Sequence, residues 1–356
     1  MKRILCLMAA AALLLGMAAC GRTEAPQPTP EAVAEVAPTP EVTPVPIPEP
    51  TAEPEVLPGT EPVLSPGAAE DSCLSALFVT GGDGAVYTGI ARAEDITDLH
   101  DLLPEDIGYI AGIIPTDGGF CVSSKEYFYS LDPSALYYCP AEGEPSVLSA
   151  ELSPSGVFCL AGDTVFFEGY GDGSLWSVPL TGGEPAAVYP DGVQLLAAAD
   201  GFIYYARNDG VYRNDSTMTA EVKIISSNAG YLTAGPEGLC DLTYSDGGQT
   251  ALLELRDLDG RLRGRYTLEE LTDSVACFDG KVYVPQLAAE SILVFPMDGA
   301  GEPVRIGLPQ AEAYCQIRHV TENTVYYATV IDDQPRLCRV GTDGSDPQAI
   351  GDEFIF

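Results

Sequence analysis

Short apolar runs separated by turn residues make up most of the chain after about Glu70. Asp-Gly, Gly-Gly and Pro-containing turns interrupt these runs every eight to twelve residues, a spacing typical of an all-β fold. No long segment places its apolar residues at the 3.6-residue period of a helix. The pattern predicts strands over Ala76–Thr80, Ala85–Ile90, Phe120–Ser123, Tyr127–Leu131, Thr164–Phe167, Phe202–Ala206, Lys281–Val284, Ile292–Phe295 and Thr324–Thr329.

Two kinds of hairpin recur along this region. The first is a strand, a tight turn and the start of a further strand, and it is found at residues 136–145, 175–185, 292–299 and 337–347. The second precedes most copies of the first, at residues 162–167, 200–205, 279–283 and 322–327. One repeat unit is therefore about four strands long.

The repeat length can be measured from a small residue that recurs in the strand just before the turn of the second kind of hairpin. It is found at Val79, Cys121, Cys159, Ala197, Cys240, Cys277 and Cys315. Seven positions spaced by about 39 residues, with four strands per unit, predict a β-propeller of seven four-stranded blades. Six or eight blades are the alternatives, because residues 91–115 are irregular and the chain ends in another apolar triplet, Phe354–Phe356.

The units read strand, Val or Phe, two residues, Asp-Gly, a few residues and strand. In this they resemble the bacterial surface propellers of uncharacterised function that are described as TolB-like or LDL-receptor-like, over roughly residues 72 to 356. The chain lacks the Tyr-Trp-Thr-Asp signature of the receptor family, and with one Trp it also lacks WD40, kelch and quinoprotein-type signatures. The resemblance implies a platform that binds protein, peptide or glycan more often than an enzyme, and it assigns no residue to a site.

The first nineteen residues have the pattern of a secretory signal peptide, in which Lys2 and Arg3 precede an apolar run that ends at Ala19. At about sixteen residues, the run is too short to cross a bilayer of roughly 30 Å. Residues 17–20, Met-Ala-Ala-Cys, resemble the bacterial lipobox, with Met17 where Leu is usual, which implies that Cys20 is diacylated. The alternative is an ordinary cleaved signal followed by an incidental Cys.

We therefore expect a lipid-anchored protein of the cell membrane that faces the extracytoplasmic side and contacts the membrane through its lipid only. Gly21 stands where an Asp would signal retention, so in a cell with two membranes the outer one is expected. The predicted domains are a signal peptide over 1–19, the lipidated Cys and its linker over 20–69, and the propeller over 70–356.

The linker is predicted to be a disordered tether. Residues 21–66 hold 13 Pro and 8 Glu, one basic residue, Arg22, and no aromatic residue. Such a segment cannot build a core, and its Pro steps hold the backbone near polyproline II. A Pro-rich ligand for another domain is the weaker alternative.

Charge narrows the choice of partner. The chain has 17 Lys and Arg against 53 Asp and Glu, a net charge of −36. Binding nucleic acid or an anionic surface needs clustered Lys and Arg, so neither is expected as a partner. We expect a monomer that binds a protein, peptide or glycan of the cell envelope, with no cofactor.

Eight cysteines follow Cys20, an even number that in an exported protein suggests disulfides. Their positions within apolar strands, at a repeat phase that Ala197 shares, instead favour buried free thiols on the inner strands of the blades. One or two disulfides are the alternative. Metal ligation is disfavoured because the chain contains no Cys-x-x-Cys pair.

Catalytic motifs are absent from the sequence, which has only two histidines, His100 and His319. Both are interpreted as surface or strand residues rather than as a base and its partner. Neighbouring carboxylates such as Glu269/Glu270 and Asp332/Asp333 leave one alternative function open, a hydrolase or lyase of envelope polysaccharide. We assign no catalytic and no metal-binding residue.

Two segments approach calcium-site or sialidase motifs without matching their spacing. They are Asp257–Gly260 and Asp172–Trp176, and both are predicted to be hairpin turns in which Gly adopts a positive φ. Turn acids such as Asp279 and Asp343 are interpreted in the same way. Adventitious calcium at an acidic channel mouth is the alternative.

Basic and aromatic residues supply the remaining candidates for binding. Arg256, Arg261, Arg263 and Arg265 form the one basic cluster, interpreted as an outer edge paired with nearby acids or, alternatively, as a contact for an acidic ligand. In the pairs Tyr204/Tyr205 and Tyr326/Tyr327, one ring is expected between blades and the other is a candidate for a binding face. No binding residue is assigned beyond this, and loops at one channel end are expected to form a concave, acidic mouth.

Overall fold

The computed structural model describes residues 75–351, apart from residues 94, 104–106, 128, 191, 227–230, 245–249, 269–271, 273–274, 287–289, 309–314 and 333. The chain divides into two units, Met1–Pro58 and Gly59–Phe356, and every described residue belongs to the second. The predicted signal peptide, Cys20, the tether and Phe354–Phe356 lie outside the described residues. Within the described part, no helix is long and apolar enough to cross a membrane.

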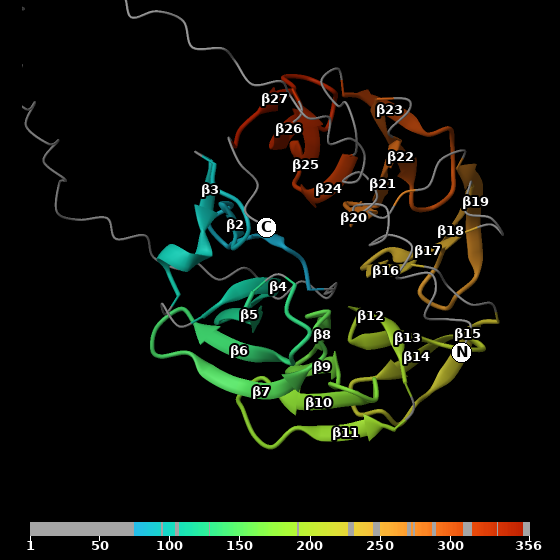
Figure 1. Cartoon of the computed structure of the whole chain (residues 1–356). Helices are drawn as coiled ribbons and strands as arrows, with labels where there is room; N and C mark the ends of the chain where they lie inside the picture. Colours follow the sequence, from blue (N-terminus) through green and yellow to red (C-terminus); the bar gives the residue numbers. More distant parts are fainter. Residues whose placement is uncertain are drawn as a thin grey trace, which may run out of the picture. The chain divides into compact units, whose positions relative to one another are not determined.

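The described chain forms seven β-sheets arranged as the blades of a ring (Figure 1). Blade 1 contains β1 (Phe78–Thr80), β2 (Val86–Thr88) and β3 (Ile96–Asp98), and a short 3-10 helix, η1 (Leu99–Asp101), follows it. Blade 2 contains β4 (Tyr109–Thr116), β5 (Gly119–Lys125), β6 (Ser134–Pro140) and β7 (Ser146–Leu152). Blade 3 contains β8 (Phe158–Ala161), β9 (Thr164–Glu168), β10 (Leu175–Pro179) and β11 (Ala186–Tyr189).

The remaining blades each have four strands. Blade 4 contains β12 (Gln194–Ala199), β13 (Phe202–Arg207), β14 (Gly210–Asp215) and β15 (Val222–Ile225). Blade 5 contains β16 (Tyr231–Gly235), β17 (Gly238–Tyr244), β18 (Ala251–Arg256) and β19 (Leu262–Leu268). Blade 6 contains β20 (Ala276–Phe278), β21 (Lys281–Gln286), β22 (Ser291–Pro296) and β23 (Val304–Gly307). Blade 7 contains β24 (Cys315–Val320), β25 (Thr324–Ile331), β26 (Gln334–Gly341) and β27 (Gln348–Ala349).

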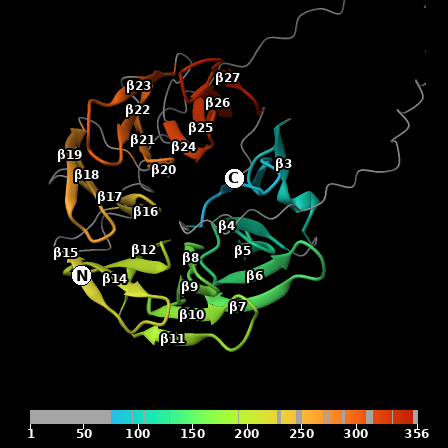
Figure 2. The ribbon, with the colours of Figure 1, turned by 180° about the vertical axis from the view of Figure 1, so that it is seen from behind.

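The strands of blades 2 to 7 are hydrogen-bonded in chain order, and each neighbouring pair is antiparallel. In blade 1, three strands are described, and β3 pairs with β2 in the parallel direction. Figures 1 and 2 show the first strand of each blade toward the middle and the fourth strands toward the rim. The predicted seven-bladed propeller is confirmed.

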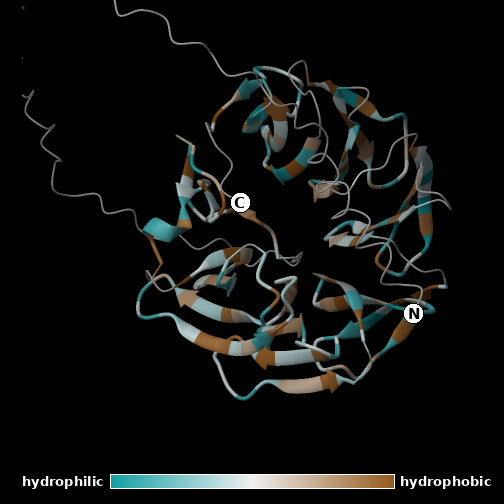
Figure 3. Cartoon of the chain, viewed as in Figure 1, coloured by the Kyte–Doolittle hydropathy of each residue, from teal (hydrophilic) through white to brown (hydrophobic). Residues whose placement is uncertain are grey.

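Apolar packing between neighbouring blades supplies the core. Side chains alternate across each strand, so every blade presents an apolar face to both neighbours. Seven apolar clusters result, one at each interface between blades. Figure 3 shows hydrophobic residues along the strands of all blades. Both rings of each tyrosine pair are buried between blades, so the expectation of one ring on a binding face is wrong for Tyr204 and Tyr205.

The ring closes between blades 7 and 1, each of which is built from one continuous segment of chain. No strand is shared between them among the described residues, so side chains make the closure. Its core packs Phe78 and Ile96 of blade 1 against Ala328 and Leu337 of blade 7. Arg339 Nη1 also lies 2.6 Å from Asp95 Oδ2 at this interface.

The segment before β1 lies against the inner strands of two further blades. Ala76 exchanges two backbone hydrogen bonds with Ile113 of β4, of 2.7 and 3.0 Å, and the Ser75 amide donates to the Phe158 carbonyl of β8 at 2.9 Å. Ser75 approaches so closely that a Cβ added at Gly112 would lie 2.8 Å from the Ser75 Cβ. This segment therefore fills the side of the ring centre that faces blades 2 and 3.

Two sequence predictions about strands were wrong. Tyr127–Leu131 belongs to the turn between β5 and β6, where Tyr127 and Leu131 are exposed. Asp132 and Pro133, two residues that favour turns, follow this segment, so the chain reverses here and does not continue as a strand. Cys121 and Cys240 lie on second strands, β5 and β17, whereas the other five positions of the cysteine phase lie on inner strands. A regular spacing of about 39 residues does not distinguish the two strands of one hairpin.

We expect Leu337→Ala to destabilise the propeller by about 2–5 kcal/mol, because it opens a cavity in the fully buried closure between blades 7 and 1. Leu131→Ala makes the same chemical change at a side chain that is 81% exposed, and it should cost little. Urea unfolding of both variants measures the difference. Equal losses would show that the closure does not limit stability.

Candidate functional site: the central cavity

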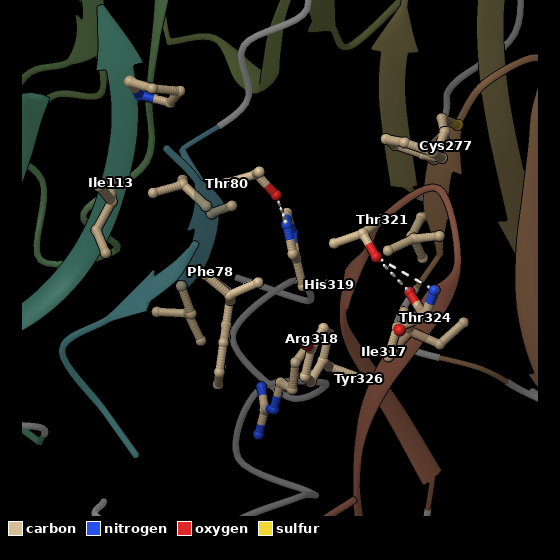
Figure 4. Close-up of a pocket in the computed structure, with 18 of the residues that line it drawn as sticks. Phe78, Thr80, Ile113, Cys277, Ile317, Arg318, His319, Thr321, Thr324 and Tyr326 are labelled. Atoms are coloured by element: carbon tan, nitrogen blue, oxygen red, sulfur yellow. Dashed lines mark hydrogen bonds between the residues drawn. The ribbon is translucent and has the colours of Figure 1, made fainter. Parts of the chain in front are cut away.

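A cavity of about 920 Å³ lies at the centre of the ring. Its walls come from the inner strands of blades 1, 2, 5, 6 and 7 and from the turns after β1 and β24. The lining mixes apolar side chains, such as Ile317 in Figure 4, with a substantial polar share that includes Thr80, Thr321 and Thr324. A cavity of this size that combines apolar walls with polar groups is the usual form of a ligand site.

A β-bulge places polar side chains on the wall of this cavity. The pairing of β24 with β25 shifts register between Ile317 and His319, leaving Arg318 as the extra residue. Arg318 and His319 both border the cavity, and Figure 4 shows the His319 ring extending toward Thr80 and the Arg318 side chain extending away from it. The bulge lies in the blade that closes the ring.

His319 is hydrogen-bonded across the closure between blades 7 and 1. Its Nε2 lies 2.7 Å from Thr80 Oγ1, and the tautomer of the imidazole decides which group donates. Desolvation by the surrounding protein lowers the pKa of His319 to about 4. The imidazole is therefore neutral at pH 7 and supplies a hydrogen bond, not a positive charge.

Formal charge is sparse in this cavity. Among the described residues that line it, only Arg318 and Glu322 are charged at neutral pH. The expected acidic channel mouth is not found among the described residues of this lining, in which Glu322 is the one carboxylate, although the turn that contains Asp83 borders the cavity through Gly82 and Gly84. Tyr326 is the one member of the two tyrosine pairs that borders the cavity, with 7% of its surface exposed.

The other candidate catalytic residues are not brought together. His100 Nδ1 lies 3.0 Å from Asp98 Oδ1 on η1, and Arg92 Nε lies 2.9 Å from the other oxygen of Asp98. Asp332 lies in the turn between β25 and β26 with a φ of 52°. Glu269, Glu270 and Asp333 lie outside the described residues.

The Asp-Gly segments are hairpin turns, as predicted. Asp257 Oδ1 accepts hydrogen bonds from the amides of Asp259 and Arg261, and Gly260 has a φ of 84°. Asp172 Oδ1 accepts from the Ser174 amide at 2.9 Å in the turn before β10. Each of these carboxylates satisfies its own backbone turn.

The basic cluster is paired within blade 5. Arg256 and Arg265 both bind Glu254, whose Oε1 lies 2.7 Å from Arg265 Nε. Burial favours the neutral acid, but these two guanidinium groups outweigh it and hold the pKa of Glu254 below its usual range. Arg263 donates to the Glu237 carbonyl at 3.1 Å. The paired-edge interpretation is supported, with Glu254 as the acid.

Asp241 lies beside this ion pair, directly opposite Glu254 on the neighbouring strand. It is completely buried, and neither carboxylate oxygen makes a hydrogen bond of normal geometry among the described residues. Desolvation and the charge of Glu254 raise the pKa of Asp241 to about 6, although Arg256 and Thr243 moderate the rise. Neither the pairing nor the burial of Asp241 has a local signal in the sequence.

The described cysteines are present as thiols and not as disulfides, as the sequence favoured. They are Cys121, Cys139, Cys159, Cys240, Cys277, Cys315 and Cys338, and all but Cys277 are fully buried. Cys73 lies outside the described residues. Burial raises the pKa of the Cys139 thiol to about 12, which makes it unreactive at neutral pH.

Comparison with known proteins identifies no family. No protein-family model and no curated protein sequence matches the chain. The similar solved structures include apo AztD from Citrobacter koseri, at 12% identity and a TM-score of 0.44 over 70% of this chain and 73% of AztD. TolB from Acinetobacter baumannii has 13% identity and a TM-score of 0.32, over 66% of this chain and 52% of TolB. A nidogen/laminin complex has 12% identity and a TM-score of 0.37, over 53% of this chain and 75% of the matched one.

We expect His319→Gln to weaken the pH dependence of stability below about pH 6.5. The folded-state pKa of His319 is about 4, below the unfolded value near 6.5, so the unfolded chain binds the proton first. Stability is therefore full above pH 6.5 and falls by up to roughly 3 kcal/mol toward pH 4. Gln retains a hydrogen-bonding group near Thr80 without titrating.

The measurement is urea unfolding at pH 7, 5.5 and 4.5 for both proteins. The same pH slope in both would contradict a neutral His319. An independent check is the NMR titration of the imidazole signal that disappears in His319→Gln, which should have its midpoint near pH 4.

We expect Asp241→Asn to stabilise the propeller at pH 7 by roughly 2–3 kcal/mol, less any cost of burying the amide. The folded-state pKa of Asp241, about 6, exceeds the unfolded value near 3.9. Its contribution to stability is therefore largest below about pH 4 and is lost as pH rises through 6. The gain from the substitution should shrink as pH falls to 4.5.

Glu254→Gln is the matched control, since it removes a neighbouring carboxylate whose pKa is lowered. It should destabilise the protein at pH 7, because two arginines lose their partner. Urea unfolding at pH 4.5 and 7 distinguishes the two acids. A loss of stability at pH 7 in Asp241→Asn would show that Asp241 is stabilised as an anion.

Proposed function

We propose that this propeller is a binding module whose ligand enters the central cavity, and that it is held on the extracytoplasmic side of the cell membrane by lipidated Cys20 and the tether over residues 20–69. The observation that carries the proposal is the central cavity of about 920 Å³, which Arg318 and His319 border at the bulge of β24. The ring supplies the rigid wall, and polar side chains of blades 1, 5 and 7, such as Thr80, Thr233 and His319, supply groups that orient a ligand.

The composition of the wall selects among protein, peptide and glycan ligands. A glycan is covered with hydroxyl groups, and each one buried against an apolar wall without a partner costs free energy. A peptide or protein segment with an apolar side chain satisfies the wall, and a carbonyl or carboxylate on it suits Arg318 and the neutral His319. We therefore favour an inserted peptide or protein segment over a glycan, and over the cationic peptide that net charge alone favours.

The alternative, a polysaccharide hydrolase or lyase, needs two carboxylates about 5–10 Å apart across a substrate site. Among the described residues of the cavity wall, Glu322 is the one carboxylate. The chemistry of this wall therefore supports binding more than it supports glycoside cleavage.

The test is partner capture with a filled cavity. Ala276 borders the cavity at the edge of the core between blades 6 and 7, and Ala276→Phe would occupy part of the cavity volume. Val304→Phe places the same ring on the outer strand of the same blade, at a residue that is 65% exposed. Wild type and both variants would be extracted in their native form with mild detergent, cross-linked and analysed by mass spectrometry.

We expect a partner that wild type and Val304→Phe capture equally and that Ala276→Phe captures at least tenfold less, with an unchanged melting temperature. Equal capture by all three proteins would place binding outside the cavity. An empty capture together with activity on a panel of polysaccharides would favour the enzyme instead.

A further inference from the structure

Two thiols meet at the interface between blades 5 and 6. Cys240 is on β17 and Cys277 is on β20, and both belong to the apolar cluster between these blades. They lie close enough for the Cys277 side chain to raise the pKa of the Cys240 thiol. Gly235, at the end of β16 in blade 5, lies beside Cys277, since a Cβ added at Gly235 would be in ordinary contact with the Cys277 Cβ, at 3.6 Å.

The two thiols differ in access. Cys277 is half-buried and lines the central cavity, where Figure 4 shows it among the cavity residues. Cys240 is completely buried behind it. The Cys277 side chain and burial both raise the pKa of the Cys240 thiol, so Cys240 is the weaker first nucleophile. The arrangement has one sulfur that a small reagent can reach and a second sulfur beside it.

We propose that Cys240 and Cys277 form a redox site, which a small disulfide oxidant converts into a covalent bond between blades 5 and 6. The Cys277 thiolate attacks one sulfur of the oxidant R–S–S–R, which releases RS⁻ and leaves a mixed disulfide on Cys277. The released RS⁻ takes the proton of Cys240, and the Cys240 sulfur then attacks the Cys277 sulfur and expels the second RS⁻. Two protein thiols are oxidised to one disulfide, and one R–S–S–R is reduced to two R–SH.

The bond changes two properties of the propeller. It links residues on neighbouring blades that are otherwise held together by packing, and this restrains the unfolded chain between residues 240 and 277. It also removes a thiol from the cavity wall. In the oxidising surroundings expected for an exported protein, the linked form would persist, but the chemistry can be tested on purified protein without reference to export or to the ligand.

The experiment oxidises the purified full chain with 4,4′-dithiodipyridine, a small aromatic disulfide, and maps it with trypsin without reduction. Trypsin releases Cys240 in residues 224–256 and Cys277 in residues 266–281, and neither peptide contains another cysteine. We expect these two peptides to be recovered linked, and the melting temperature to rise by roughly 5 °C or more. Adding a reductant should reverse both effects.

Two variants keep the outcome interpretable. Cys277→Ser should give no linked peptide and no rise in melting temperature, whereas Cys240→Ala should accumulate the thiopyridine adduct on Cys277. Cys139→Ala, a change at another buried thiol, should behave as wild type. Recovery of Cys277 in wild type as a reduced thiol, or as an adduct that persists, would overturn the proposal.

Discussion

The fold depends on the packing that closes the ring between blades 7 and 1. Each of these blades is a continuous segment of chain, so the closure relies on the apolar cluster around Phe78 and Leu337, the ion pair of Arg339 with Asp95 and the contact of His319 with Thr80. In the described part, the apolar clusters lie between neighbouring blades, so stability is approximately the sum of blades and interfaces. A ring with one open interface would expose an apolar face on two blades at once.

The same closure determines where the polar groups of the cavity lie. The segment before β1 pairs with β4 and reaches β8, so it occupies the side of the ring centre next to blades 2 and 3. The remaining space is bordered largely by blades 5, 6, 7 and 1. His319 and Thr80 are 239 residues apart and meet only because the ring is closed. The geometry of the candidate site is thus a consequence of closure.

The seven blades and most strands could be predicted because alternation and turn chemistry are local, and a period of about 39 residues repeats them. The Tyr127–Leu131 turn was misassigned because aromatic residues have strand propensity whether buried or exposed. His319 had no local signal, since a bulge depends on pairing with β25. Asp241 and the Cys240–Cys277 contact depend on which blade face a strand presents, and a slip of one residue reverses that face.

Net charge describes the surface of this protein better than its candidate site. Acidic residues of the described turns, such as Asp257 and Asp172, accept hydrogen bonds from the amides of their own hairpins. Three groups whose pKa values are shifted lie instead between blades. They are His319 at the closure, Asp241 on the face of blade 5 toward blade 4, and Cys240 beside Cys277 between blades 5 and 6. Each interface has few polar atoms, so a proton or a disulfide there changes contact between two blades directly. Of these groups, His319 and Cys277 also line the cavity, so protonation of one and oxidation of the other would each change its wall.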